Sequence, residues 1–561
     1  MNKQHSIENH PWRKTPLALA ILAALQGAAV QEAFATGVVP AGPPPNPVGP
    51  EFQASTYNGG NYPSPTVAMD AHGDFVVTWQ GVDNDSLGIL AQRYNAAGVA
   101  QGSEFQVNTT ITSTQGQPAV AMDAAGDFVI AWGSYGLDGS QWNIYAQRYN
   151  AAGEPQGDEF QVNTYTTNDQ FDPAVAMDAA GDFVVVWQSG YGQDGDSFGV
   201  YAQRYNATGV PQGDEFQVNT YTTNGQFAPA VAMDAAGDFV VAWQSAGQDG
   251  TALVVYAQRY DKTGVPQGSE FRVSPESLGL DNYSPAVAMD AAGDFVVTWE
   301  NQVWASSEPE GIYARRYNAV GEPQSAFLVN TYPLTGHPVF PAVAMDAAGD
   351  FVVTWHNYED GNGWSIYAQR YNAAGAPQGS EFRVNTNTLN QSYLDLAVAM
   401  DAVGDFVITW QRITQDGTNW VASAQRYAPN KYNTAFSTPV LSNQRTDRTA
   451  VPEGPAGTFS FDATFCHNDN PLYLYPLTGL VSQTVILTNG NCLINRLYGP
   501  AGTPPLTPGA PPCGAGSALD FPVIGNYSDY ALAVGECVTV HYQIGLQNRK
   551  RFSFFVDVGG I

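Results

Sequence analysis

The sequence predicts an all-β protein: a seven-bladed β-propeller closed by an N-terminal strand and followed by a disulfide-bonded β-sandwich. First, the stretch Ala-Val-Ala-Met-Asp-Ala-Ala-Gly-Asp-Phe-Val-Val-Thr-Trp, as at 286–299, returns seven times with a period of 53 to 56 residues. Second, each repeat holds four short β-branched or aromatic runs separated by turn residues. Third, all four cysteines follow the last repeat. Seven repeats of four strands fit a propeller, and a stacked solenoid is the alternative.

The N-terminus has the features of an export signal. Arg13 and Lys14 precede the uncharged apolar stretch 16–30, and Ala33-Phe34-Ala35 is a small-x-small cleavage site. We therefore expect a signal peptide over residues 1–35 and an exported protein, periplasmic, at the cell surface or extracellular. Residues 36–50 are rich in Pro and Gly and are expected to be a linker. No later apolar run is long enough to span a membrane, so no transmembrane span is expected.

The last repeat lacks its fourth strand, and a strand of the same type occurs at the N-terminal end of the repeat region. In one repeat the four expected strands are 173–177, 182–187, 200–205 and 215–218. The fourth type begins with Glu-Phe, and no such strand follows the last repeat, which ends at Tyr427. The missing strand occurs instead at 51–55. If it joins the last blade, the propeller covers 51–427 and both ends of the chain close the ring, which protects exposed strand edges.

The order of the strands resembles that of the NHL and YWTD-like propellers, and also repeats of large secreted bacterial proteins. The matching segments are Pro173–Asp178, Gly181–Phe183, Val200–Tyr205 and Gly209. The resemblance covers about residues 51–427 and implies that the first strand of each repeat lies nearest the propeller axis. It implies no particular activity.

After the repeats, residues 428–457 are expected to be a linker and residues 458–561 a second domain. Gly535-Glu536-Cys537-Val538-Thr539-Val540 resembles a turn and strand of bacterial immunoglobulin-like sandwiches. An even number of cysteines in an exported protein predicts two disulfides. Three pairings are open, of which Cys466–Cys537 together with Cys492–Cys513 is the favoured one. The four cysteines are Cys466, Cys492, Cys513 and Cys537.

The charge excludes two classes of partner. Acidic residues outnumber basic ones 52 to 22, and such a negative protein repels nucleic acid and anionic membranes. Catalytic and cofactor motifs are absent: the sequence has no P-loop, no Gly-x-Ser-x-Gly and no histidine spacing typical of a metal site. No catalytic residue and no cofactor are therefore assigned, although paired carboxylates such as Asp194 and Asp196 leave calcium binding open.

Residues common to all repeats are expected to be structural. The Asp-Ala-Ala-Gly-Asp segment has the chemistry of a tight turn, and the Trp that ends the second strand is expected to pack between blades. An Arg alternates with Tyr in the third strand, as at Arg204, and the seven copies suggest a ring of charge-assisted bonds to the repeat Asp residues.

The loops that differ between repeats are those joining strand two to three and strand four to the next blade. Antiparallel strands place both on one face, called here the variable face. Its aromatic, carboxylate and amide groups suit sugars, although polar turn-forming loops are the simpler interpretation. The candidate ligand-binding residues are Tyr165, Asp169, Tyr191, Asp194, Asp196, Trp304, Tyr358, Asp360, Trp364 and Trp420.

These patterns favour a non-catalytic binding or adhesion protein that uses the variable face for a glycan or protein ligand at the cell surface. Two alternatives remain open. One is a polysaccharide-active hydrolase or lyase with its site at the mouth of the propeller, marked by two nearby carboxylates. The other is a structural extracellular scaffold.

Overall fold

The computed structural model describes most of the repeat region and a set of strands that follow it. The described residues are 45, 47–56, 63–83, 86–110, 113–136, 141–250, 253–275, 280–303, 310–330, 337–359, 363–386, 394–414, 419–428, 440–447, 458–466, 480–487, 492–493, 537–545 and 554–560. The predicted signal peptide, Trp304, Asp360 and Cys513 lie outside them.

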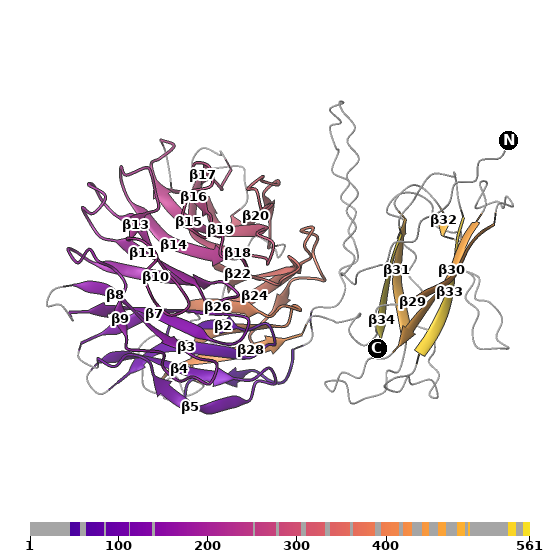
Figure 1. The fold of residues 1–561 in the computed structure, drawn as a ribbon, viewed down its shortest axis with the longest axis horizontal. Helices are drawn as coiled ribbons and strands as arrows, with labels where there is room; N and C mark the ends of the chain where they lie inside the picture. Colours follow the sequence, from indigo (N-terminus) through magenta and orange to yellow (C-terminus); the bar gives the residue numbers. More distant parts are fainter. Residues whose placement is uncertain are drawn as a thin grey trace, which may run out of the picture. The chain divides into compact units, whose positions relative to one another are not determined.

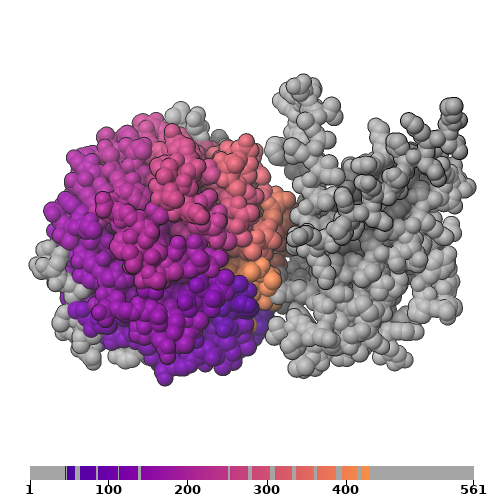
Figure 2. Space-filling model, in the orientation of Figure 1, coloured from indigo at the N-terminus to yellow at the C-terminus, as the bar shows by residue number. Residues whose placement is uncertain are grey.

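The repeats form a seven-bladed β-propeller, as predicted (Figure 1). Each blade is a four-stranded antiparallel sheet, and the first strand of each blade lies against the first strands of both neighbours around the axis. Contact between β2 and β26 completes the circle, and Figure 2 shows the indigo first blade beside the orange last blade. Among the described residues there is no helix.

The blades are numbered by the order of their inner strands. Blade 1 consists of β2 (Thr66–Met69), β3 (Phe75–Val82), β4 (Leu87–Tyr94) and β5 (Ala100–Gln106). Blade 2 consists of β6 (Gln115–Met122), β7 (Phe128–Tyr135), β8 (Trp142–Tyr149) and β9 (Phe160–Gln161). Blade 3 consists of β10 (Gln170–Met177), β11 (Phe183–Ser189), β12 (Gly199–Tyr205) and β13 (Phe216–Gln217). Blade 4 consists of β14 (Gln226–Met233), β15 (Phe239–Ala246), β16 (Leu253–Tyr260) and β17 (Phe271–Arg272).

The remaining blades follow the same order. Blade 5 consists of β18 (Leu280–Met289), β19 (Phe295–Val303), β20 (Gly311–Tyr317) and β21 (Phe327–Leu328). Blade 6 consists of β22 (His337–Met345), β23 (Phe351–Glu359), β24 (Gly363–Tyr371) and β25 (Phe382–Arg383). Blade 7 consists of β26 (Leu394–Met400), β27 (Phe406–Ile413), β28 (Trp420–Tyr427) and the N-terminal strand β1 (Phe52–Gln53).

The N-terminal segment pairs with blade 7 over more residues than the sequence analysis assigned to it. Beyond β1, Pro47 forms a bridge with Tyr427, as Pro211 does with Tyr205 in blade 3. The segment Pro-x-Gly-x-Glu-Phe at 47–52 repeats the one at 211–216, which explains the equivalent pairing. The predicted linker over 36–50 is therefore wrong at its end, because residues 47–50 belong to the last blade.

The constant turn between the first two strands of a blade is held by its first aspartate. Asp178 Oδ1 accepts the backbone N–H groups of Ala180 at 2.8 Å and Asp182 at 2.9 Å. Gly181 has a φ of +87°, which only glycine adopts readily. Asp182 Oδ1 then accepts the N–H of Ala207 at 2.7 Å, which joins this turn to the one between strands three and four. The turn is structural, as predicted.

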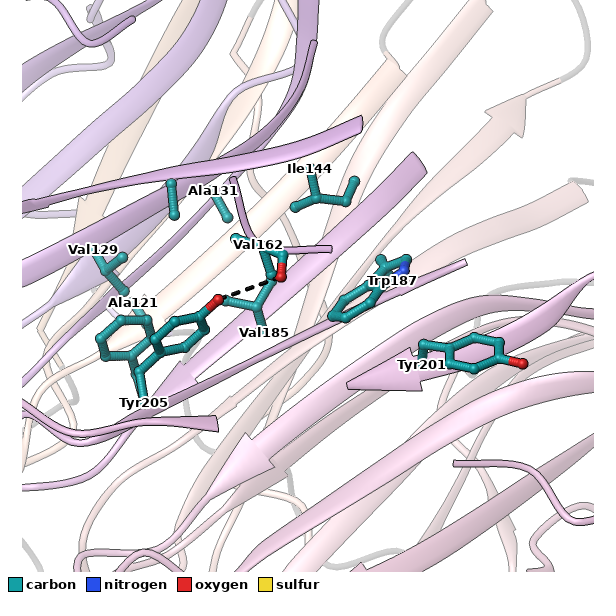
Figure 3. Packing of buried hydrophobic residues seen from close by; sticks show 11 residues of the cluster. Ala121, Val129, Ala131, Ile144, Val162, Val185, Trp187, Tyr201 and Tyr205 are labelled. Atoms are coloured by element: carbon teal, nitrogen blue, oxygen red, sulfur yellow. Dashed lines mark hydrogen bonds between the residues drawn. The ribbon is translucent and has the colours of Figure 1, made fainter. Parts of the chain in front are cut away.

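The blades are joined by aromatic packing. Trp187 is completely buried, in one hydrophobic cluster with blade 2 residues such as Ile144 and Val162 (Figure 3). The Tyr205 ring stacks on Phe183 of its own blade, with centroids 4.9 Å apart, and its hydroxyl donates to the carbonyl of Val162 in blade 2. Burial of such large rings at every blade boundary provides the main cohesion of the propeller.

The predicted ring of bonds from the repeat arginines to the repeat aspartates is wrong, because the arginines donate to other acceptors. Arg204 Nη1 donates to the carbonyl of Thr263 in blade 4 at 2.5 Å, and no ion pair joins a repeat arginine to an aspartate among the described residues. Arg426 of blade 7 donates to the carbonyl of Ala96 in blade 1. The arginines of six blades therefore link their blade to the next through main-chain carbonyls, because the aspartates already accept backbone N–H groups.

Beyond the propeller, two small sheets are described. One has the order β29 (Val440–Asp447), β30 (Thr458–Cys466), β33 (Cys537–Gly545) and β32 (Cys492–Leu493), and the other pairs β31 (Leu480–Leu487) with β34 (Phe554–Gly560). This sheet begins with β29, before the predicted boundary at residue 458. In the register of β30 and β33, Cys466 lies opposite Cys537.

Candidate functional site at the propeller axis

A cavity of about 180 Å³ opens on the axis at the end formed by the constant turns. It is lined by the Met-Asp-Ala segment of all seven blades. The aspartates there are already used by the turns: Asp290 Oδ1, for example, accepts N–H groups from Ala292 and Asp294. In the described part of the chain no three His, Cys, Asp or Glu side chains are placed to hold a metal ion. The aspartates at this end of the axis therefore have a structural role, because they hold the turns of the blades.

The other end of the axis carries a ring of side chains that differ from blade to blade. Each blade has one residue with a left-handed backbone, with φ between 42° and 54°, in its inner strand or, in blade 1, just before it. None of the seven is glycine, although residues with a Cβ rarely adopt this conformation, and such strain is concentrated at functional sites. We call these residues the axial ring: Ser64, Gln117, Asp172, Ala228, Ser284, Phe340 and Asp395.

The left-handed conformation arises from a bulge in the inner strand. In blade 3 the pairing of β10 with β11 skips from Phe171 to Ala174, so two residues between them have no partner. Proline follows the ring residue in six blades, and a proline at a bulge costs no ladder hydrogen bond. In blade 7 leucine takes its place, and the skip is shorter, from Leu394 to Leu396.

Four of the strained residues donate their N–H to the preceding blade, to the side chain that follows the repeat Trp. The N–H of Ala228 donates to Gln188 Oε1 at 3.1 Å, and the N–H of Phe340 donates to Glu300 Oε2 at 3.1 Å. Blade 2 has Gly133 at this position, which has no side chain to accept a bond. There the N–H of Asp172 donates instead to Oε1 of Gln117, at 3.2 Å.

Four neighbouring blades contribute a polar arc to the axial ring. Going round from blade 7 to blade 3, the ring residues are Asp395, Ser64, Gln117 and Asp172. Ser64 Oγ donates to Asp395 Oδ2 at 2.7 Å, and Gln117 Nε2 donates to Asp172 Oδ1. The rest of the ring is Ala228, Ser284 and Phe340. Two carboxylates, each with one amide or hydroxyl donor, thus belong to the axial ring, three blades apart around the axis.

Both carboxylates are deep in the propeller yet reached by solvent. Burial raises the pKa of the Asp172 carboxyl to about 6, and burial also raises the pKa of Asp395, against a smaller lowering by the Ser64 hydroxyl. Solvent nevertheless reaches the Asp395 side chain, which is exposed, and the Asp172 side chain, which is half-buried. Protein atoms thus crowd each carboxyl group while part of its side chain still meets water. A carboxylic acid with a pKa near 6 is suited to donating a proton near neutral pH.

The axial ring is not evident from the sequence when only the constant residues and the variable loops are compared between repeats. The signal was the variable residue before the repeated Pro-x-Val-Ala-Met-Asp, as at Asp172. A position whose residue type changes within an otherwise constant segment is not needed to stabilise every blade. Its side chain can therefore take part in function.

The predicted carboxylates on the variable face mainly organise loops. Asp169 Oδ1 accepts the N–H of Trp142 from blade 2 at 3.1 Å. Asp194 Oδ1 accepts the N–H of Asp196, whose Oδ2 accepts the N–H of Asn224 in the next blade at 2.8 Å. Buried Asp194 Oδ2 has no hydrogen-bond partner.

The predicted aromatic residues fall into separate groups. Tyr191 is 61% exposed and packs at a tilt against Phe198 of blade 3. Tyr358 lies against Trp364 in blade 6, with centroids 5.2 Å apart. Tyr165 and Trp420 are half-buried in blades 2 and 7. The structure thus distributes these residues around the propeller, and none of them belongs to the axial ring.

His356 is a further polar residue that the sequence analysis did not select. It follows the repeat Trp355, is completely buried, and neither ring nitrogen has a hydrogen-bond partner. Burial lowers its pKa to about 3, so the ring is neutral in the folded protein. The ring of Trp364 meets it edge-on, with centroids 6.4 Å apart.

Comparison with known proteins gives similarity in structure only. No protein-family model and no curated protein matches the sequence. The chain is similar to a protein of unknown function from Dyadobacter fermentans, with 9% identity and a TM-score of 0.41, over 67% of this chain and 98% of that one. It is similar to the polysaccharide lyase Uly1, with 11% identity and a TM-score of 0.42, over 64% and 90%. It is also similar to a Penicillium chrysogenum α-L-arabinanase, with 14% identity and a TM-score of 0.40, over 57% and 99%.

At these identities the similarity concerns the fold alone. None of the three is named as an NHL or YWTD-like protein, so that resemblance stays a prediction. Within the described ranges, no helix has the length and apolar character needed to cross a membrane.

Proposed function

We propose that the axial ring is the active site of a glycoside hydrolase that acts on an uncharged glycan. The observation that carries the proposal is the polar arc, in which Asp172 and Asp395 lie at the mouth of the axis on strained backbone. Glycoside hydrolysis commonly uses two carboxyl groups, one as an acid and one as a base or nucleophile. This replaces non-catalytic binding, which the sequence alone favours, as the leading function.

The chemistry assigns different roles to the two groups. Asp172, protonated below its raised pKa, donates its proton to the glycosidic oxygen as the bond from that oxygen to the sugar carbon breaks. Gln117 donates to Asp172 Oδ1 and so holds the carboxyl in place. The Asp395 carboxylate stabilises the positive charge that develops on the sugar carbon. Water supplies the hydroxyl that completes the product, and its second proton passes to a carboxylate.

The composition of the ring favours hydrolysis over elimination. A lyase that removes a proton beside a uronic acid carboxylate must stabilise added negative charge, which requires a cation or several strong donors. The axial ring contains no Lys, Arg or His, and the chain carries a formal net charge of −30. Such a site repels polyuronates and accepts neutral or amino sugars.

Non-catalytic glycan binding is the second candidate function. It is favoured by large aromatic residues at the start of the third strand in several blades, at the edge of the variable face. These residues are Trp142, Phe198, Trp364 and Trp420, and all four are half-buried.

We also propose the domain organisation that the sequence predicts, with two changes. The signal peptide over 1–35 directs export, the propeller extends from Pro47 to 427, and the second domain begins with β29. The Cα atoms of directly opposed residues in antiparallel strands are about 4.5–5.5 Å apart, within the range that a disulfide bridges. The register of Cys466 and Cys537 therefore supports their pairing, with Cys492 and Cys513 as the other pair.

The experiment is hydrolysis of soluble arabinan, xylan, galactan, β-glucan and polygalacturonate by the mature protein, measured as released reducing sugar. We expect one neutral glycan to be cleaved and polygalacturonate to be left intact. Cleavage should fall as the pH rises above about 6, because Asp172 must be protonated. Asp172→Asn and Asp395→Asn should each lower kcat at least about 100-fold, whereas Val265→Ala, an exposed change outside the ring, should leave it nearly unchanged. Unchanged turnover in both Asn variants would overturn the proposal.

A further inference from the structure

Blades 3 and 4 carry an aromatic surface patch that differs from the rest of the propeller. Four rings meet there: Phe171, Tyr191, Phe198 and Phe227, called here the aromatic patch. Each of the other three rings packs on Phe198, with centroids 4.5 Å away for Tyr191, 5.4 Å for Phe227 and 5.9 Å for Phe171.

None of the four rings is buried. Tyr191 is 61% exposed, and the other three are half-buried. At the position of Phe171 the other blades have Pro63, Gly116, Tyr283, Val339 and Leu394, as well as Phe227 itself. The patch is therefore not required by the repeat, and an exposed group of aromatic rings on a soluble protein marks a binding surface.

The patch adjoins the axial ring through the chain itself. Phe171 immediately precedes Asp172 in β10, and Phe227 immediately precedes Ala228 in β14. The inner strands β10 and β14 are neighbours around the axis. The patch thus extends outward from the end of the polar arc where the proposed acid lies.

Polar groups border the aromatic patch. Asn168 donates to the carbonyl of Tyr191, and Asp196 Oδ2 accepts the N–H of Asn224, which ties the loops of the two blades together. Sugar rings present C–H faces that stack on aromatic rings and hydroxyls that bond to amides and carboxylates. The absence of a basic residue from the patch and its borders excludes an anionic sugar as the favoured ligand.

We propose that the aromatic patch is a sugar-binding subsite, which holds a neutral sugar unit of the glycan next to the unit cleaved at Asp172. The proposal rests on the proposed hydrolase function for its position relative to the reaction, and glycan binding tests it independently. The glycan chain then runs from the axis across blades 3 and 4, with Tyr191 as the ring that stacks on the sugar.

The test separates binding from turnover. Binding of arabinan, xylan, galactan and β-glucan is measured by affinity electrophoresis in the Asp172→Asn background, where bound glycan is not consumed. Tyr191→Ala should weaken binding of the recognised glycan at least tenfold, and Tyr191→Phe should retain it, because the stacking ring remains. Tyr135→Ala removes another exposed tyrosine, on blade 2, and should leave binding unchanged. Thermal unfolding should show that all variants are folded.

In the active protein, Tyr191→Ala should raise KM and leave kcat within about threefold, because the patch holds the substrate without taking part in proton transfer. Unchanged binding in Tyr191→Ala, an equal loss in Tyr135→Ala, or no binding of any of the four glycans would overturn the subsite. If Asp172→Asn hydrolyses glycan normally while Tyr191→Ala still weakens binding, the hydrolase proposal fails and the subsite stands.

Discussion

Phe52 at the N-terminal end of the propeller pairs with Ala424 in its last blade, so residues more than 370 positions apart share one sheet. The N–H of Ala54 continues the pairing by donating to the carbonyl of Ala422 at 2.8 Å. Glu51 then accepts the N–H of Thr386 from blade 6, as Glu215 accepts that of Thr164 between blades 2 and 3. The N-terminal segment thus occupies the same position as the fourth strand of every other blade.

We expect deletion of residues 36–56 to lower the thermal unfolding midpoint sharply, with a loss of at least about 2 kcal/mol. The deletion removes several main-chain hydrogen bonds and leaves the edge of β28 unpaired. Deleting only 36–44, which stops before Pro47, is the matched control and should leave the midpoint unchanged. Equal midpoints for the two deletions would show that the N-terminal segment does not stabilise the ring.

Arg204→Ala should destabilise the propeller by about 1–2 kcal/mol, because its guanidinium joins the carbonyls of Gln212 in blade 3 and Thr263 in blade 4. The measurement is urea unfolding. Val210→Ala, an exposed change in the same blade, should alter stability by less than about 0.5 kcal/mol. If Arg204→Ala abolishes glycan binding without loss of stability, the arginine belongs to a ligand site instead.

His356 should make the propeller sensitive to acid. Its pKa is about 3 when folded, against an ordinary value of 6.5, so the unfolded chain binds a proton that the folded protein excludes. Stability is therefore highest above pH 6.5 and falls as the pH decreases toward 3. His356→Gln introduces the residue found at this position in other blades, such as Gln188. The substitution should remove this contribution of His356 to the pH dependence of stability.

The comparison is urea unfolding of the wild-type protein and His356→Gln at pH 7.5 and pH 4.5. Between these values the wild-type protein should lose about 2 kcal/mol more than the variant. Parallel pH dependence of the two proteins would contradict the assignment of a neutral, buried histidine.

Blades 3 and 4 differ in one ion pair, and the difference predicts a stabilising substitution. In blade 4, Arg272 forms an ion pair with Asp249. The corresponding residues of blade 3 are Gln217 and Asp194, and buried Gln217 Nε2 and Asp194 Oδ2 have no hydrogen-bond partner. Gln217→Arg should raise stability by about 0.5 kcal/mol, and Arg272→Gln should lower it by a similar amount. A lower unfolding midpoint for Gln217→Arg would show that blade 3 cannot hold the arginine as blade 4 does.

The architecture could be predicted well from the sequence because every blade is stabilised by the same residues at the same positions of the repeat. Asp178, Gly181 and Trp187 recur in every blade, and each has a local role that residue type alone reveals. The acceptor of Arg204 was predicted wrongly. Spacing along the chain does not show that the carboxylates of the repeat aspartates already accept hydrogen bonds within the turns. The N-terminal boundary was drawn too late because Pro47 and Gly49 were read as linker residues instead of repeat residues.

The candidate site was harder to predict than the fold. Asp172 and Asp395 belong to one ring through the circular order of the blades, and no local spacing along the chain relates them. Their positions also depend on a strand bulge whose left-handed backbone has no signature in residue type, since Ser, Gln, Asp, Ala and Phe all occupy it. The sequence could show that the residue before Pro173 varies, but not that it borders the axis.

In the proposed division of roles, the repeated aspartates build the fold and the ring aspartates perform the chemistry. The most direct measurement compares Asp172→Asn with Asp178→Asn, two substitutions six positions apart in one strand and its turn. We predict that Asp172→Asn abolishes glycan hydrolysis with an unchanged unfolding midpoint. Asp178→Asn should lower the midpoint while the folded protein keeps its specific activity, because Asp178 only holds a turn. Full activity in Asp172→Asn, or loss of activity at unchanged stability in Asp178→Asn, would contradict the account.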